Sequence, residues 1–228
     1  MGEKTENSGT GHRARLRERL LIRGGDALLD HELVEYLLAL AIPRRDTKPL
    51  AKQLIAHYGS LAALLTADAT NIARQPGMGE TSTAALKIVQ AAALRMLSEP
   101  VREMPILASW QALLDYLRAD MAHLTTERVR VLYLNSKNQL VRDEIAGEGS
   151  IDQAPIYVRE VIRRAIDLGA SAVILVHNHP SGDSAPSRQD ISLTREIMDA
   201  GKKLGIVVHD HIIVGKDGYS SMRSAGLI

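Results

Sequence analysis

The stretch LVHNHPSGDSAPSRQD, residues 175–190, decides how the second half of the chain folds. An apolar run, Ala172–Val176, predicts a buried strand that ends in His177 and His179. Residues two apart on an extended chain point to the same side, so both imidazoles face one way. Ligands commonly bind beyond the carboxyl ends of strands in open α/β sheets. The sequence therefore predicts a pair of histidines at such an edge.

The same stretch continues through a turn-rich loop, residues 180–186, into a helix that begins at Ser187 and carries Asp190 in its first turn. Two imidazoles and one carboxylate form a ligand set that suits Zn²⁺ with a fourth position open for water. Ser187 and Asp190 alone are typical of a helix N-terminal cap, and capping is compatible with ligation because the helix dipole favours a carboxylate there. The same ligand types also bind non-haem iron(II).

The rest of the second half alternates between helical and β-branched segments. We expect helices at 109–122, 157–168 and 187–204, and strands at 128–135, 139–146, 171–176, 206–214 and 219–222. This order predicts an α/β domain, residues 106–228, with a mixed sheet flanked by helices.

The first half is helical throughout. Leucine, isoleucine and alanine recur at spacings of three and four over residues 12–100, with short breaks at Asp, Gly and Pro. The change in composition at Ser98-Glu99-Pro100 predicts a domain boundary near residues 98–106. Residues 1–11 have no apolar periodicity and predict a disordered tail.

Composition excludes several classes of protein. The 228 residues carry a formal net charge of +1, so there is no global field for nucleic acid or an anionic membrane. Cysteine is absent, which excludes disulfides, thiolate metal sites and a cysteine nucleophile. The chain has no long apolar stretch and a polar start, from which we expect a cytoplasmic protein without membrane contact. Aromatic residues make up 3%, too few for base-stacking platforms.

Two segments of the first half are candidates for weak contact with nucleic acid. Residues 12–23 hold five arginines against Glu18, although their spacing favours a solvated helix face over phosphate contact. Residues 76–84 combine two glycines with a following helix, and such a turn can present amides to a phosphate. The turn resembles a helix-hairpin-helix, an element that also serves simply to pack helices.

The motif His177-x-His179-Pro180, with Ser187 and Asp190, matches the JAMM signature of the JAB/MPN metalloprotease superfamily. The longer run HNHPSGDSAPSRQD, with Gly205-Ile206 and residues 210–215 downstream, resembles the RadC family, historically called DNA repair proteins. The first half is similar to the helical region of that family at Arg13, Arg15-Leu16, residues 29–33 and the Pro76–Gly79 turn. The resemblance covers nearly the whole chain.

The resemblance implies a JAB/MPN sheet with deaminase-like layering, preceded by a helix-hairpin-helix-like domain. It also implies an upstream glutamate where a helix gives way to the first core strand, which makes Glu127 the candidate. Without the family, a solvent-facing charge at a strand start would be the better interpretation of Glu127. Glu144, Glu148 and Glu160 are less well placed, but Glu148, which is expected in a glycine-flanked loop, stays open as an alternative.

The mechanism implied is that of a zinc metallohydrolase that cleaves amide or isopeptide bonds. Zinc on His177, His179 and Asp190 would lower the pKa of a bound water towards ~7. Glu127 would move its proton to the leaving amine, and Ser187 would donate to the developing oxyanion. A peptide or isopeptide-linked substrate is expected.

Two other functions remain open at this point: a DNA-associated repair or recombination factor that binds DNA through its helical domain, and a non-catalytic MPN scaffold. A second polar cluster, His209, Asp210 and His211, also has two interpretations. Asp210 and His211 either orient a metal ligand or pack at the end of a strand. We therefore leave them off the ligand set.

Overall fold

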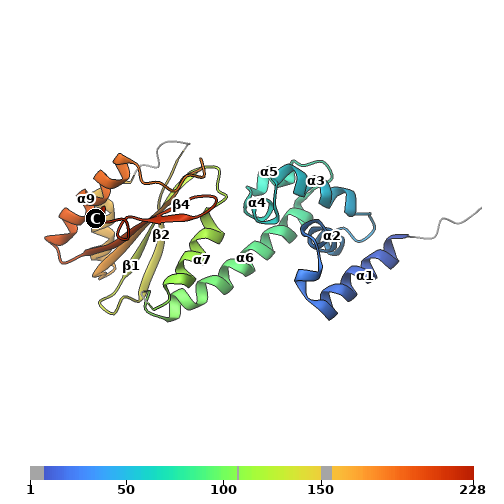
Figure 1. Cartoon of the computed structure of the whole chain (residues 1–228), viewed down its shortest axis with the longest axis horizontal. Helices are drawn as coiled ribbons and strands as arrows, with labels where there is room; N and C mark the ends of the chain where they lie inside the picture. Colours follow the sequence, from blue (N-terminus) through green and yellow to red (C-terminus); the bar gives the residue numbers. More distant parts are fainter. Residues whose placement is uncertain (1–7, 107, 150–155) are drawn as a thin grey trace, which may run out of the picture. The chain divides into compact units, whose positions relative to one another are not determined.

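The computed structural model describes residues 8–106, 108–149 and 156–228, and Figure 1 shows the order of its elements along the chain. Contacts divide the chain into two compact units, Met1–Ala92 and Ala93–Ile228. Each is described by itself.

The first unit is helical. Its elements are α1 (Ser8–Arg23), the short 3₁₀ turn η1 (Gly25–Ala27), α2 (Asp30–Ala41), α3 (Lys48–Tyr58), α4 (Leu61–Thr66), α5 (Ala69–Ala73) and the start of α6 (Glu80–Glu103). Their apolar faces meet in one core of buried leucine, isoleucine, valine and alanine side chains: Val34, Leu38, Leu50, Ala51, Leu54, Leu64, Ile72 and Leu86. The predicted spacing of apolar residues thus corresponds to real buried helix faces.

The start of the chain and the boundary differ from the expectation in detail. Most of the expected tail, residues 1–7, lies outside the described residues, and residues 8–11 belong to α1. α6 runs through Pro100 to Glu103 instead of stopping at the proline, and the division between the units falls inside this helix. A proline removes one helical hydrogen bond, but Val101, which is 1% exposed, packs into the core of the second unit. Tertiary burial outweighs the local break.

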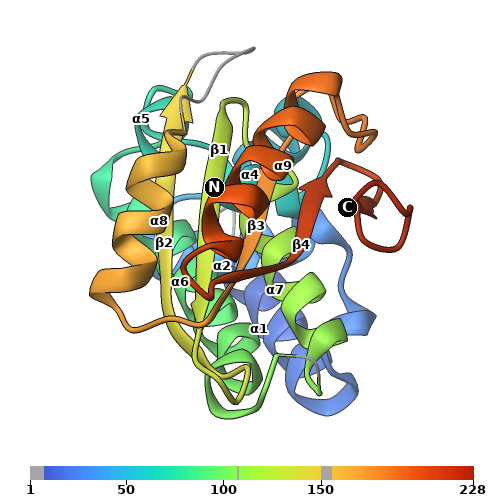
Figure 2. The same cartoon turned by 90° about the vertical axis from the view of Figure 1, so that its left-hand side faces the viewer.

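The second unit is a five-stranded mixed sheet with helices on both faces (Figure 2). The elements after α6 are α7 (Trp110–Met121), β1 (Glu127–Leu134), β2 (Leu140–Gly149), α8 (Val158–Asp167), β3 (Ala172–Asn178), α9 (Arg188–Lys202), β4 (Val207–Val214) and β5 (Tyr219–Ser221). The strand order is β2-β1-β3-β4-β5, in which only β3 and β4 pair in parallel. The predicted α/β fold, a mixed sheet flanked by helices, is confirmed.

Alternation along the strands decides which helix each side chain meets. Ile174 and Val176 pack toward α7, whereas Val173 and Leu175 pack toward α8 and α9. His177 follows in the second series, so the strand delivers it to the α9 side at the carboxyl end of β3. The β3–α9–β4 crossover thus brings the start of α9 to this end of the sheet. No helix among the described residues is long and apolar enough to cross a membrane.

Candidate metal centre

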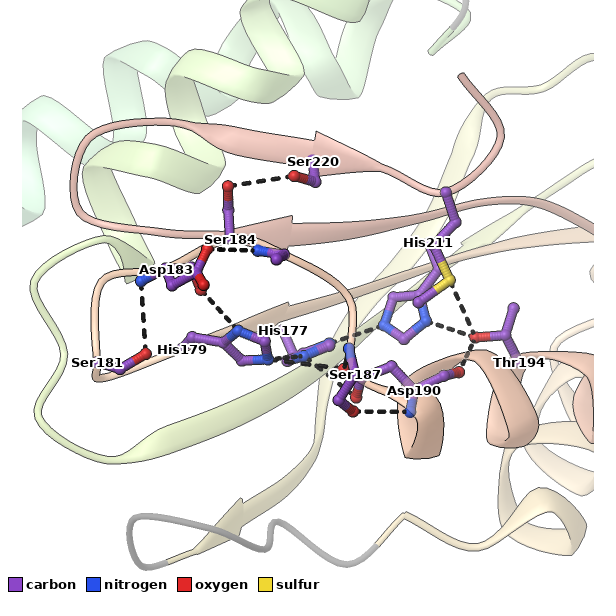
Figure 3. Close-up of polar contacts among 12 residues, drawn as sticks. His177, His179, Ser181, Asp183, Ser184, Ser187, Asp190, Thr194, His211 and Ser220 are labelled. Carbon is purple, nitrogen blue, oxygen red and sulfur yellow. Dashed lines mark hydrogen bonds and ion pairs between the residues drawn. The ribbon is translucent and has the colours of Figure 1, made fainter. Parts of the chain in front are cut away.

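Three side chains converge beyond the carboxyl end of β3, as Figure 3 shows. His177 and His179 come from the end of that strand and Asp190 from the first turn of α9. One ligand atom from each lies within 4.8 Å of the others. The Nε2 atoms of the two histidines are 2.9 Å apart, and the Asp190 carboxylate oxygens lie 3.4 Å from His177 and 3.6 Å from His179. The cluster of two histidines and an aspartate is a possible metal-binding site.

The loop between strand and helix is fixed by its backbone. The His179 amide donates to the Val214 carbonyl of β4, and the Gly182 amide donates to the His179 carbonyl. Gly182 has a φ of +91°, a conformation that favours glycine. Gly215 lies so close to the Gly182 carbonyl that a Cβ there would overlap it. The histidine-containing turn is therefore held against the end of β4.

A capping box places the carboxylate. Ser187 Oγ accepts from the Asp190 amide at 3.1 Å, and Asp190 Oδ2 accepts from the Ser187 amide at 2.7 Å. Both sequence interpretations of these residues are therefore compatible, because the carboxylate that caps α9 also faces the histidines. The serine capping bond uses a lone pair of Oγ, which leaves the hydroxyl hydrogen available as a donor.

Each histidine is also held from behind. His179 Nδ1 lies 2.7 Å from the Asp183 carbonyl oxygen. A carbonyl only accepts, so Nδ1 carries a proton, and in the neutral ring Nε2 presents its lone pair to the cluster. His177 Nδ1 lies 2.8 Å from Nε2 of His211, which comes from β4. Both ring orientations therefore rest on contacts outside the cluster.

The electrostatics of the cluster separate its members. Burial lowers the pKa of His177 to about 4, so this ring is neutral at neutral pH. The Asp190 carboxylate raises the pKa of His179. Burial opposes ionisation of Asp190, but the two histidines and the hydrogen bonds from Ser187 hold its pKa below the ordinary range. The site therefore keeps an ionised carboxylate beside a neutral imidazole.

Glu127 begins β1 at the same end of the sheet. Val129, two residues further along β1, pairs with His177 of β3. The charge of Glu127 contributes to raising the pKa of His179. The structure therefore brings Glu127 to the cluster.

The side chain of Asn178, which lies between the two histidines in sequence, fixes the backbone on both sides of Glu127. Its Oδ1 accepts from the Arg128 amide at 2.9 Å, and its Nδ2 donates to the Thr126 carbonyl at 3.0 Å. Asn178 is 1% exposed. The buried side-chain amide therefore bonds to the β1 backbone just beyond the last pair of the β1–β3 ladder, Val129 and His177.

The three other glutamates considered from the sequence are paired with arginines. Glu148 meets Arg128 at 2.9 Å, Glu160 meets Arg163 at 2.8 Å, and Glu144 contacts Arg164. These ion pairs lie on β1, β2 and α8 and give the carboxylates structural partners.

The three residues of the second polar cluster, 209–211, make contacts in three different places. His211 is the member that reaches His177. Asp210 accepts from the His211 amide, the Ser221 hydroxyl and the Arg223 amide, and so holds the C-terminal turn to β4. His209 contacts Asn138 Oδ1 at 2.7 Å. The pairing of β4 with β3 passes from Val208 directly to Asp210, so His209 has no partner in this ladder, and Asp210 and His211 then point to opposite faces.

In the helical unit, two arginines of the segment 12–23 already have partners. Arg13 donates to the carbonyls of Pro43 and Arg45, and Arg19 forms a fork with Glu32. In the turn 76–84, Arg45 donates to the Gly77 carbonyl at 3.2 Å. This contact places a positive charge at the turn, whereas residues 76–84 themselves contain no arginine or lysine.

Comparison with known proteins agrees with this architecture. Residues 107–227 match the family described as RadC-like JAB domain, and residues 10–84 match UPF0758 N-terminal. The fold and the cluster beyond β3 thus define the second unit as a JAB domain.

A protein of Rhodobacter capsulatus, named UPF0758 protein, is 48% identical over 213 residues, which cover 93% of this chain and 100% of that protein. The chain belongs to the RadC family.

Two residues that support the site, Asn178 and Thr194, are not predicted from the sequence. A polar residue between two candidate ligands at the end of an apolar strand was a signal for Asn178. Thr194, which is fully buried and lies 2.6 Å from His211 Nδ1, stands in a helix where threonine carries no distinctive signal. Only the pairing of β3 with β4 and the packing of α9 bring it close.

Proposed function

We propose that this protein is a zinc-dependent hydrolase of the JAMM type that cleaves amide or isopeptide bonds. The observation that carries the proposal is the convergence of His177, His179 and Asp190, with Nε2 of the two rings turned to one point. A peptide or an isopeptide-linked conjugate is the proposed substrate, and the cytoplasm is the proposed compartment.

The donor set fits zinc. Two imidazole nitrogens and a carboxylate oxygen are ligands that Zn²⁺ takes in catalytic sites with an open fourth position. Ligands must be deprotonated to bind, and Asp190 is ionised and His177 neutral at neutral pH. Zinc in such a site supplies activation of a water molecule at neutral pH, by lowering the pKa of that water to ~7.

Two further residues have proposed catalytic roles. Glu127 accepts a proton from the attacking water and passes it to the departing amine nitrogen, for which its position beside His179 is suitable. Ser187 donates its hydroxyl hydrogen to the oxygen of the scissile carbonyl as negative charge develops there. The capping bond from the Asp190 amide holds that hydroxyl next to the cluster.

The proposed zinc site is tested by measuring the metal content of the full chain purified without added metal. We expect near-stoichiometric zinc in the wild type and in Glu127→Gln, and its loss in His177→Ala and Asp190→Ala. His209→Ala is the matched control, because this histidine contacts Asn138 and lies on β4 outside the cluster.

Zinc retained in His177→Ala and Asp190→Ala, or iron in place of zinc, contradicts the proposal. The absence of bound metal after zinc is supplied also contradicts it and favours a non-catalytic MPN scaffold. Loss of zinc in Glu127→Gln would make Glu127 a ligand in place of a base. With zinc bound, a screen of peptide and isopeptide conjugates follows, in which Glu127→Gln is the inactive control.

Contact of the helical unit with DNA is a second proposal, as expected of a repair or recombination factor. Arg45 at the Gly77 turn favours it, whereas the internal contacts of Arg13 and Arg19 weaken it. Its test is an electrophoretic shift of duplex DNA at low salt, since phosphate contacts weaken steeply with salt. No shift at low salt overturns direct contact.

A further inference from the structure

A buried chain of hydrogen bonds runs behind the candidate metal centre and returns to it. His177 Nδ1 lies 2.8 Å from His211 Nε2, and His211 Nδ1 lies 2.6 Å from Thr194 Oγ1. Thr194 Oγ1 lies 2.6 Å from the backbone carbonyl oxygen of Asp190. The three side chains are 2%, 2% and 0% exposed, so bulk water does not compete for these contacts. Figure 3 shows the chain from His177 through His211 to Thr194.

Counting protons fixes the direction of every bond in the chain. The Asp190 carbonyl only accepts, so the single hydroxyl hydrogen of Thr194 is donated to it. The threonine oxygen must then accept from His211 Nδ1. A neutral imidazole carries one N–H, so His211 Nε2 is bare and accepts from His177 Nδ1. The Met222 sulfur, 3.7 Å from the same hydroxyl, also only accepts and leaves this order unchanged.

The consequence appears at the other side of the His177 ring. With the proton on Nδ1, the lone pair is on Nε2, the atom that faces His179 Nε2 and Asp190 Oδ1. We propose that Thr194 and His211 are positioning residues that set the tautomer of His177 and thereby the affinity of the cluster for a metal ion. This inference rests on the proposed function, in which His177 is a ligand.

The two histidines of the cluster differ in how firmly their tautomers are set. His179 donates directly to the Asp183 carbonyl, which can only accept a hydrogen bond. His177 donates to a second imidazole, which can accept at Nε2 only while its own proton stays on Nδ1. The threonine hydroxyl is what keeps it there. Without that hydroxyl, His211 can carry its proton on Nε2, and the proton of His177 then moves to the atom that faces the metal.

The test compares Thr194→Val with Thr194→Ser in the full chain. Valine has the shape of threonine but no hydroxyl, whereas serine keeps the hydroxyl. We expect Thr194→Val to weaken Zn²⁺ binding by about 10- to 100-fold, the usual effect of losing such a supporting contact. We expect Thr194→Ser to bind as the wild type does. Zn²⁺ affinity is measured by competition with a chromophoric chelator.

A second readout uses ¹⁵N NMR of the histidine side chains in zinc-free protein at neutral pH. The wild type and Thr194→Ser are expected to carry the protons of His177 and His211 on Nδ1, and Thr194→Val to carry that of His177 on Nε2. Because the wild-type spectrum alone tests the assignment, failure of a variant to fold leaves the inference testable.

Three results would overturn the inference. They are a wild-type proton on His177 Nε2, unchanged zinc affinity in Thr194→Val, and equal weakening in both variants, which would indicate a packing defect. If the wild type binds no zinc, the proposed function fails, and the NMR result still decides whether the hydrogen-bond chain sets the tautomer.

Discussion

The two units of the protein both pair histidine with a carboxylate, but with different outcomes. In the helical unit, His12 Nε2 of α1 meets Glu35 Oε1 of α2 at 2.9 Å, one ring to one acid. In the sheet unit, His177 and His179 share Asp190, and each ring has a further contact behind it. The first arrangement joins two helices, and the second turns several donor atoms to one point.

The two arrangements differ in whether polar atoms remain directed to a common point after the contacts within the fold are made. A polar side chain whose bonding capacity is used within the fold stabilises packing, whatever its charge. A candidate site needs atoms that converge after the internal contacts have been counted. By this criterion, Arg13 and Arg19 belong to the packing of the helical unit, whereas the cluster beyond β3 is a candidate site.

The largest change in the free energy of unfolding is expected at Arg130. This residue tests, inside the sheet unit, whether polar side chains that are fully paired within the fold stabilise it. Arg130 donates to Asp143 at 2.9 and 2.7 Å and also contacts Asp120, all three side chains being largely buried. Arg130→Met leaves two buried carboxylates without their cation. We expect a loss of about 3–5 kcal/mol in the free energy of unfolding. Urea unfolding followed by Trp110 fluorescence measures it, because this sole tryptophan reports on the sheet unit.

A matched variant separates lost charge from lost packing. Combining Arg130→Met with Asp120→Leu and Asp143→Leu removes the whole ionic cluster, and we expect this variant to regain most of the lost stability. If Arg130→Met were as stable as the wild type, the ionic cluster would not stabilise the fold, and the criterion would be wrong for the sheet unit.

The next effect is expected at Asn178, where structure and site meet. Asn178→Leu leaves the Arg128 amide and the Thr126 carbonyl without their buried partner. We expect a loss of about 1–3 kcal/mol in the free energy of unfolding, again from Trp110 fluorescence, while His177, His179 and Asp190 themselves are unchanged.

The control for this prediction is Asn178→Asp, which keeps an acceptor for the Arg128 amide but loses the donor to the Thr126 carbonyl. We expect a defect in unfolding free energy here too, because the new carboxylate oxygen faces a carbonyl oxygen. Wild-type stability in both variants would show that the buried amide does not hold the start of β1.

Local patterns sufficed to predict the sheet, its helices and the convergence of the His-His-Asp cluster. These residues lie within a short stretch of chain, and alternation along the strand and the first turn of the helix determine where their side chains point. Position within the fold decided the rest. His211 lies 34 residues from His177 and reaches it only because β3 and β4 pair in parallel. The extension of α6 through Pro100 likewise depends on the burial of Val101 in a core formed by distant residues.

A smaller effect is expected at the fork between Arg19 and Glu32 in the helical unit. The hydrogen bonds of 2.8 and 2.9 Å from Arg19 lower the pKa of Glu32 to about 2. The pair therefore stabilises the folded state at pH values above the ordinary range of a glutamate, and the contribution is lost as the pH falls towards about 2.

Because the pair is partly exposed, we expect Glu32→Gln to lose only about 0.5–1 kcal/mol at neutral pH, and the difference from the wild type to vanish in acid. Urea unfolding followed by far-ultraviolet circular dichroism at both pH values measures it. A difference that grows as the pH falls would contradict the sign of the pKa shift.

The smallest effect is expected at Arg15 and Arg17, which are exposed on α1. Exposed side chains away from packed features change stability little, so we expect Arg15→Gln with Arg17→Gln to unfold within about 0.5 kcal/mol of the wild type. Arg13→Gln is the matched control and should cost more, because it removes contacts to the Pro43 and Arg45 carbonyls. If α1 contacts DNA, the double variant should also reduce the salt dependence of the electrophoretic shift by about one unit per arginine. A larger stability loss in the double variant than in Arg13→Gln would mean that these two arginines hold α1 in place, and the division between packing arginines and free ones would fail.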